Sequence, residues 1–162
     1  MIPMKFVLGI NALGLILCAL AQTDGNNVSY PVGYRRWAHV KSTLIGPQHP
    51  RYESNGGLHH FYANDKALEG YRTGKFPDGA VLVDDLFELI DKGGGVTSEG
   101  ARRRIAVMAK DTARYRDTGG WGFEVFKGDD STPSLNAAGR AACVACHGER
   151  KAHDFVYSQY RN

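Results

Sequence analysis

The run Cys143-Val144-Ala145-Cys146-His147, near the end of this 162-residue chain, limits what the chain can fold into more than any other feature. C-x-x-C-H is the signature of covalent haem c attachment. Two thiols one short turn apart can form thioethers with the two vinyl groups of one haem, and the next residue offers an imidazole to the iron. The motif therefore predicts one haem c, attached through Cys143 and Cys146 and ligated by His147, on an alanine-rich helix over 136–147.

Three other uses of a C-x-x-C pair fit this chain less well. A structural zinc site needs four ligands, and the third cysteine, Cys18, lies in a segment that we expect to be removed. A thioredoxin-like pair would open a helix after a strand in a βαβ unit, and the sequence shows no such alternation. A disulfide across two residues would be strained.

The N-terminus has the form of a secretory signal peptide. Residues 1–5 carry one positive charge, residues 6–20 are almost wholly apolar, and Ala19-Leu20-Ala21 gives a small-x-small cleavage pattern. The apolar run is short for a bilayer span, and a retained membrane anchor is the alternative. Haem c is attached outside the bacterial cytoplasmic membrane, so the motif and the signal both predict a periplasmic protein.

The sequence divides into a signal peptide at 1–21, a flexible, polar lead-in at 22–29 and a single domain at 30–162. The domain is long enough to bury a real hydrophobic core. The formal net charge of +3 for the chain is too small to indicate a nucleic-acid or membrane-surface partner. The basic runs Tyr34-Arg35-Arg36 and Arg102-Arg103-Arg104 are therefore interpreted as solvated faces or as partners of haem propionates.

The domain is predicted to be mainly β, in the α+β class, with a few short helices. Asn64 predicts the N-cap of a short helix that ends near Gly70 or Gly74, and residues 93–100 are predicted to form an exposed loop. Short apolar runs, several of them alternating with polar residues, are separated by turn residues, which favours an antiparallel sheet. The predicted strands are 37–42, 58–63, 80–83 with 86–90, 104–110, 121–126 and 155–160.

The position of the haem motif separates the common classes of cytochrome c. In small electron-transfer cytochromes the motif lies near the N-terminus and a later methionine is the sixth ligand, whereas no methionine follows His147 here. A helix-bundle cytochrome c′ has its motif near the C-terminus but needs long amphipathic helices. Twenty glycines and short β-like runs do not provide them.

Five segments, one of which includes the haem motif, occur in order along the predicted domain. They are Tyr34-Arg35-Arg36-Trp37, the strand that contains Tyr62, the run 73–81, Trp121-Gly122-Phe123, and the C-x-x-C-H motif followed by Asp154-Phe155-Val156. In these segments the chain resembles the cytochrome P-460 / cytochrome c′-beta family. The resemblance implies an antiparallel β domain, usually a homodimer, with one haem c bound through the histidine of its motif. It also implies five-coordinate, high-spin iron with an open distal side that binds small molecules such as nitric oxide.

The P-460 members of this family oxidise hydroxylamine and carry an additional covalent link from a lysine to the haem. The resemblance places that lysine just after a Gly-Ala-Val-x-Val stretch, which is 79–83 here and is followed by Asp84. A carboxylate cannot form the nitrogen–carbon link. The P-460 chromophore is therefore expected to be absent, unless Lys75 or Lys110 supplies the link from elsewhere.

Met108, His39, His59 and His60 are the residues that could ligate the iron from its distal side. A methionine in an alternating apolar strand is expected in the core. Neighbouring strand residues point to opposite faces, so at most one of His59 and His60 enters the pocket, and a hydrogen bond at the surface or a dimer seam is the expected role of each. The candidate walls of the haem pocket are Phe61, Tyr62, Phe87, Trp121 and Phe123, and the candidate propionate partners are Arg35, Arg36 and Arg140.

The resulting hypothesis is a periplasmic mono-haem cytochrome c that reversibly binds nitric oxide or carbon monoxide. A neutral gas can enter a pocket poor in hydrogen-bond donors because it has little hydration to lose. Two alternatives stay open. One is an electron-transfer cytochrome in which Met108 or a histidine completes six-coordination, with a redox partner protein. The other is an oxidoreductase that acts on hydroxylamine, nitric oxide or peroxide.

Overall fold

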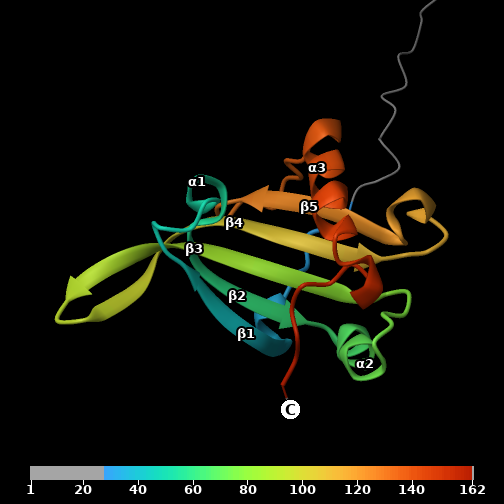
Figure 1. Cartoon of the computed structure of the whole chain (residues 1–162), viewed down its shortest axis with the longest axis horizontal. Helices are drawn as coiled ribbons and strands as arrows, with labels where there is room; N and C mark the ends of the chain where they lie inside the picture. The colour runs from blue at the N-terminus through green and yellow to red at the C-terminus, as the bar shows by residue number, and fades with distance from the viewer. Residues whose placement is uncertain (1–27, 162) are drawn as a thin grey trace, which may run out of the picture.

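The computed structural model describes residues 28–161 and contains a five-stranded antiparallel sheet (Figure 1). Each strand pairs with the next one along the chain, so the sheet is a meander with its first and last strands at the edges. The predicted mainly-β fold with an antiparallel sheet and a few short helices is confirmed. The strands are β1 (Ala38–Ile45), β2 (Gly57–Ala63), β3 (Val81–Gly93), β4 (Val96–Lys110) and β5 (Trp121–Lys127).

Three α-helices and three 3-10 turns connect or follow the strands. The predicted short helix is α2 (Asp65–Thr73), and Asn64 caps it because its side-chain oxygen accepts a hydrogen bond from the Ala67 N–H at 2.9 Å. Gly74, with φ 77°, ends the helix in the left-handed conformation that glycine adopts without strain. The other elements are α1 (Tyr52–Asn55), α3 (Ala137–Gly148), η1 (Tyr34–Arg36), η2 (Arg116–Thr118) and η3 (Lys151–His153).

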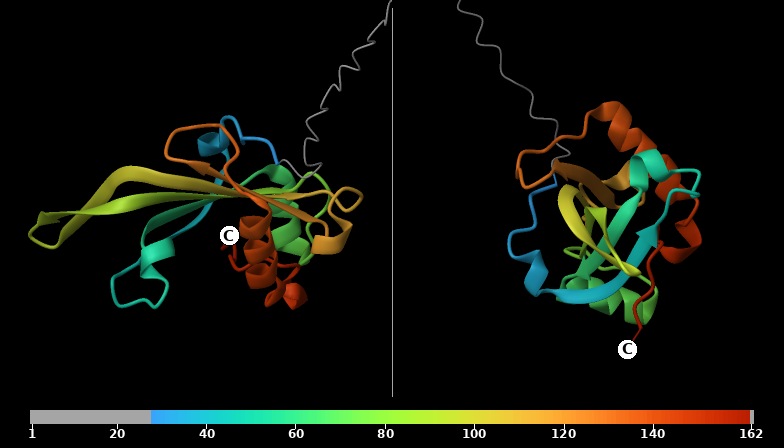
Figure 2. Two further views of the ribbon diagram at one scale, coloured as in Figure 1. Left: turned by 90° about the horizontal axis from the view of Figure 1, so that it is seen from above. Right: turned by 90° about the vertical axis from the view of Figure 1, so that its left-hand side faces the viewer.

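The two faces of the sheet are buried by different parts of the chain. Alternate residues of a strand point to opposite faces, and β4 follows this rule as predicted. Ile105 and Val107 belong to a core cluster with Val28 and Tyr34 of the N-terminal segment, whereas Met108 packs against a second cluster that includes residues of α2 and α3. The helices and the C-terminal segment therefore cover one face only, which is the face that carries the candidate site (Figures 1 and 2).

The prediction of an exposed loop at 93–100 is wrong, because β3 and β4 continue as a hairpin. Their pairing runs from Val81 opposite Ala109 out to Gly93 opposite Val96. The hairpin projects from the sheet as a long arm (Figure 2). Both faces of the arm meet solvent over much of its length, so its sequence lacks the apolar alternation by which a half-buried strand is predicted.

The predicted C-terminal strand at 155–160 is also wrong. Asp154 and Phe155 have φ angles of 51° and 66°, which turn the chain away from an extended conformation. The N–H groups of Phe155 and Val156 donate to the carbonyl oxygens of Arg150 and His153, at 2.9 and 3.1 Å. These backbone groups are thus used in a turn after η3 and are not available to a sheet.

The predicted signal peptide at 1–21 and most of the predicted lead-in lie outside the described residues. Val28, at the end of that lead-in, is buried in the cluster beneath the sheet. Among the described helices, none combines the length and the apolar character that crossing a bilayer requires.

Candidate functional site

The C-x-x-C-H motif occupies the last turns of α3. The helix begins where the sequence predicts it, because the Asn136 side chain accepts a hydrogen bond from the Gly139 N–H at 2.8 Å. Cys143 packs against the core cluster on the covered face of the sheet, and α3 makes its main contact with β5. Both Cys143 and Cys146 are free thiols.

His147 is oriented by the turn that follows the helix. Its Nδ1 lies 2.7 Å from the carbonyl oxygen of Phe155. A carbonyl can only accept, so Nδ1 carries the proton and Nε2 keeps its lone pair. Burial lowers the pKa of His147, and the hydrogen bond to Phe155 only partly opposes that effect. A neutral imidazole with a free Nε2 is the form in which histidine ligates a metal.

A cavity of about 610 Å³ lies between α3, the C-terminal segment and the sheet. Its volume is within the range of about 300–1,000 Å³ that is common for cofactor sites. Cys143, Cys146 and His147 all line it, together with residues of all five strands. The apolar part of its lining is Ile45, Phe61, Leu82, Val83, Ala106, Val107, Met108, Phe123, Val125, Ala142 and Val156.

These features together fit a haem c held by covalent bonds. Two free thiols and a neutral imidazole open into one mainly apolar space, as a porphyrin with two vinyl groups and an iron requires. Among residues 28–161, no three histidine, cysteine or acidic side chains are grouped to bind a bare metal ion. The thiols, the imidazole and the apolar lining of the cavity together fit a prosthetic group.

The comparison with protein families agrees with this chemistry. The family model described as Cytochrome P460 matches residues 31–158. The chain belongs to the cytochrome P460 family. Membership implies that the chain is a haem cytochrome, and it accounts for a cavity that combines thiols, an imidazole and an apolar wall. A search among curated proteins gives no match.

The structure divides the two neighbouring histidines of this cytochrome P460-family chain as the strand rule requires. His59 lines the cavity and is only 4% exposed, so the expectation of a surface or seam position is wrong for it. His60 does not line the cavity, and its ring nitrogens meet the Ser42 hydroxyl and the Glu99 carboxylate, each at 2.8 Å. His39 lies beside His60, with 6.1 Å between the ring centroids.

The candidate pocket aromatics divide in the same way. Phe61 and Phe123 line the cavity, and the Phe123 ring lies 5.1 Å from the ring of His147. Tyr62 packs against Tyr34 in the other core cluster, and Phe87 lies beneath two arginine side chains. Trp121 is fully buried in the core and is not part of the lining.

Of the arginines proposed as propionate partners, Arg104 of the run 102–104 lines the cavity, whereas Arg35, Arg36 and Arg140 do not. Arg35 binds Asp85 at 3.1 Å, on the opposite strand face from Asp84, and Arg140 donates to the Leu135 carbonyl at 2.8 Å. Neither of them, nor Arg36, is among the lining residues, whereas Arg51 and Arg104 are. The sequence gives no signal for Arg51, because it lies in an irregular connection whose path follows from the tertiary structure.

The lysine expected of the hydroxylamine-oxidising relatives has no equivalent in the described lining. Asp84, which stands at that position in the sequence, does face the cavity. Lys75 is exposed, and Lys110 is buried in an ion pair with Asp154. Neither lysine is among the cavity-lining residues.

His59 and Asp84 form an ion pair in the cavity wall. His59 Nδ1 lies 2.8 Å from the Asp84 carboxylate, and Nε2 lies 2.7 Å from the carbonyl oxygen of Asn55. Both partners are acceptors, so both ring nitrogens donate and the imidazole is held as a cation. Burial alone would lower the pKa of His59, but the hydrogen bond and charge of Asp84 outweigh it and raise the pKa.

This ion pair predicts a pH-dependent stability. A histidine whose pKa is raised by folding stabilises the protein fully below its unfolded pKa of about 6.5, and this contribution is lost as the pH rises through the folded value. We expect the melting temperature to fall across that window. In Asp84→Asn this fall in melting temperature should be smaller. In the control His39→Gln, which changes an exposed histidine, the fall should equal that of the unmodified protein. If the melting temperature depends on pH in the same way in Asp84→Asn and in the unmodified protein, the ion pair is not the cause.

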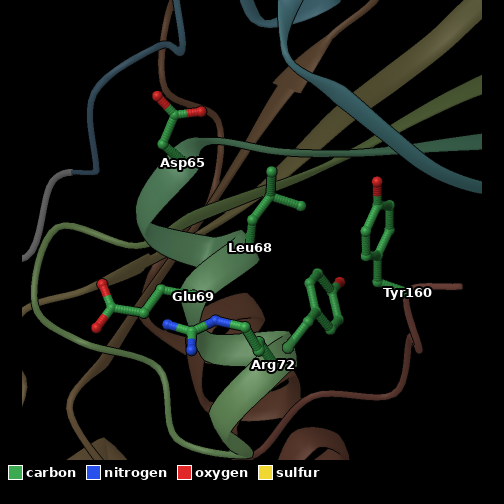
Figure 3. Close-up of a pocket in the computed structure, with 6 residues that line it drawn as sticks. Asp65, Leu68, Glu69, Arg72 and Tyr160 are labelled. Carbon is green, nitrogen blue, oxygen red and sulfur yellow. The ribbon is translucent and has the colours of Figure 1, made fainter. Parts of the chain in front are cut away.

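A second cavity, of about 470 Å³, lies beside α2 and is also lined by Tyr160 of the C-terminal segment (Figure 3). It is lined by Leu68 and Tyr71, by three charged side chains of α2, and by Tyr160 near the C-terminus. It contains no cysteine or histidine, so the cavity beside α3 is the candidate site.

Proposed function

We propose that this chain is a periplasmic mono-haem cytochrome c whose cavity binds a small neutral gas, with nitric oxide as the first candidate. Haem c would be attached at Cys143 and Cys146, with His147 as the proximal ligand. The bound haem would supply an iron able to take a diatomic ligand. Export by the predicted signal peptide and assembly as a homodimer are part of this proposal.

The observation that carries the proposal is the convergence of both thiols and the free Nε2 of His147 on one cavity. Much of the remaining wall comes from the aliphatic and aromatic side chains of the sheet. Such a wall favours neutral ligands, because an anion or a strongly hydrated molecule would lose hydrogen bonds to water on entering.

His59 lines the cavity, but its ring nitrogens already form hydrogen bonds within the protein. Both ring nitrogens of His59 are used, one by Asp84 and one by Asn55. Ligation by His59 would break one of these hydrogen bonds and leave a buried acceptor without a partner, which is costly. This arrangement supports a free position for an exogenous ligand.

An electron-transfer cytochrome is the second candidate, and Met108 is the observation that favours it. Met108 lines the cavity, and a thioether is a suitable sixth ligand for haem iron. However, Met108 also packs in the core, directly opposite Phe123 and Leu82 in the sheet register. These neighbours support the predicted core role.

Absorption spectroscopy of the reduced protein tests the proposal. We expect high-spin bands that shift on addition of carbon monoxide or nitric oxide, and Met108→Ala should give the same spectra. A low-spin spectrum that carbon monoxide does not change, and that Met108→Ala converts to high spin, would instead establish electron transfer. A red-shifted band with hydroxylamine turnover would establish the oxidoreductase.

A further inference from the structure

The carbonyl that orients His147 belongs to an unusual piece of backbone. Asp154 and Phe155 are consecutive and both left-handed, and they are the non-glycine residues of the described chain with positive φ. This conformation is unfavourable for residues with a Cβ, so it persists only where the surroundings impose it. The Phe155 carbonyl oxygen, 2.7 Å from His147 Nδ1, depends on that local shape.

Asp154 is fixed by contacts from three other parts of the fold. One carboxylate oxygen accepts from the Phe76 N–H at 2.8 Å, in the turn before β3. The other accepts from the Lys110 ammonium at 2.8 Å, at the end of β4. The backbone carbonyl of Asp154 accepts from the Trp121 indole N–H at 2.8 Å, at the start of β5.

Lys110 and Asp154 form a buried ion pair. Lys110 is 6% exposed, and Asp154 is 7% exposed. The Lys110 ammonium also donates to the Gly119 carbonyl at 3.0 Å and lies 4.9 Å from the Trp121 ring. Either charge alone would be strongly unfavourable in this buried place, so separating Lys110 from Asp154 is costly.

We propose that the buried Lys110–Asp154 pair is a positioning device for the proximal ligand. It holds the Phe155 carbonyl where His147 Nδ1 donates to it, and so sets the tautomer and ring orientation of His147. Neither Lys110 nor Asp154 touches the cavity, so both act through Phe155. A hydrogen bond from the outer nitrogen of a ligating imidazole makes the imidazole a stronger donor to the metal.

The test uses the haem-loaded protein with Lys110→Met and Asp154→Asn. Each change should weaken the bond from Nδ1 to Phe155 and lower the iron–His147 stretching frequency measured by resonance Raman. Each should also raise the reduction potential, because a poorer imidazole donor stabilises ferric iron less. In the double variant the shift should be no larger than in either single variant.

The matched control is Asp85→Asn, which disturbs a carboxylate that is also buried but lies on the face of the sheet away from the cavity. It should lower stability while leaving the stretching frequency and the potential unchanged. Wild-type values in Asp154→Asn, or equal shifts in Asp85→Asn, would overturn the proposal. If Lys110→Met does not accumulate, Asp154→Asn still decides, because it keeps the side-chain shape.

The inference rests on the part of the proposed function in which His147 ligates the haem iron, and not on the binding of a gas. The reduction potential can be measured whether or not the iron has a sixth ligand. A protein that ignores nitric oxide but shows the expected shifts would therefore contradict the proposed function alone.

Discussion

Cys143→Ala/Cys146→Ala is expected to yield a folded protein that retains no haem on a denaturing gel stained for haem. Thioether bonds are the part of the attachment that survives denaturation, and both are lost in this variant. The sheet should persist, because α3 packs on it through residues other than the two sulfurs, such as Val144. Circular dichroism would check that the β structure remains.

His147→Ala is the matched variant for the cysteine pair. It keeps both thiols, so the haem stain should be retained, but the ferrous absorption spectrum should change because the proximal bond is missing. A stained band in the double cysteine variant would show that the haem is held elsewhere. An unchanged ferrous spectrum in His147→Ala would show that His147 is not the proximal ligand.

Asp85→Ala is expected to reduce the free energy of unfolding by about 3–5 kcal/mol, the usual cost of removing one partner from a buried ion pair. Asp85 is completely buried. It accepts hydrogen bonds from the Tyr34 hydroxyl, from Arg35 and, at 2.7 Å, from Arg102. Alanine would leave the Tyr34 hydroxyl and the largely buried Arg102 guanidinium without this acceptor.

Urea unfolding measures this loss. Asp117→Ala, which removes an exposed carboxylate, should change the free energy of unfolding by less than about 0.5 kcal/mol. A loss below about 1 kcal/mol in Asp85→Ala would contradict this prediction. It would show that water can replace the Asp85 carboxylate as the partner of Arg35 and Arg102 at little cost in stability. The absorption spectrum of Asp85→Ala should remain that of the unmodified protein.

The sequence predicts those parts of the fold where local chemistry and tertiary packing agree. Asn64 caps α2 because an amide side chain before a helix satisfies its first N–H groups. The alternation of Ile105 and Val107 against Met108 identifies β4 because both faces there are packed. The short spacing of the C-x-x-C-H motif predicts that its three residues lie close together, and all three line one cavity.

The failures come from interactions between residues that are distant in the sequence. Residues 155–160 have strand-like composition, but the contacts of Asp154 with Phe76, Lys110 and Trp121 impose a turn at their start. The arm of β3 and β4 lacks alternation because neither of its faces is covered. The sequence shows that His59 and His60 face opposite ways, but only the packing of α3 decides which face holds the cavity.

The strand order has a consequence for maturation of the protein. Because every strand pairs with its predecessor, each pairing closes a modest length of chain, and such local topology favours quick assembly. β5 ends at Lys127, well before the two thiols, so the whole sheet can form ahead of α3. Covalent attachment of haem would then follow the formation of the sheet. A chain without haem would keep its sheet and an empty cavity beside α3.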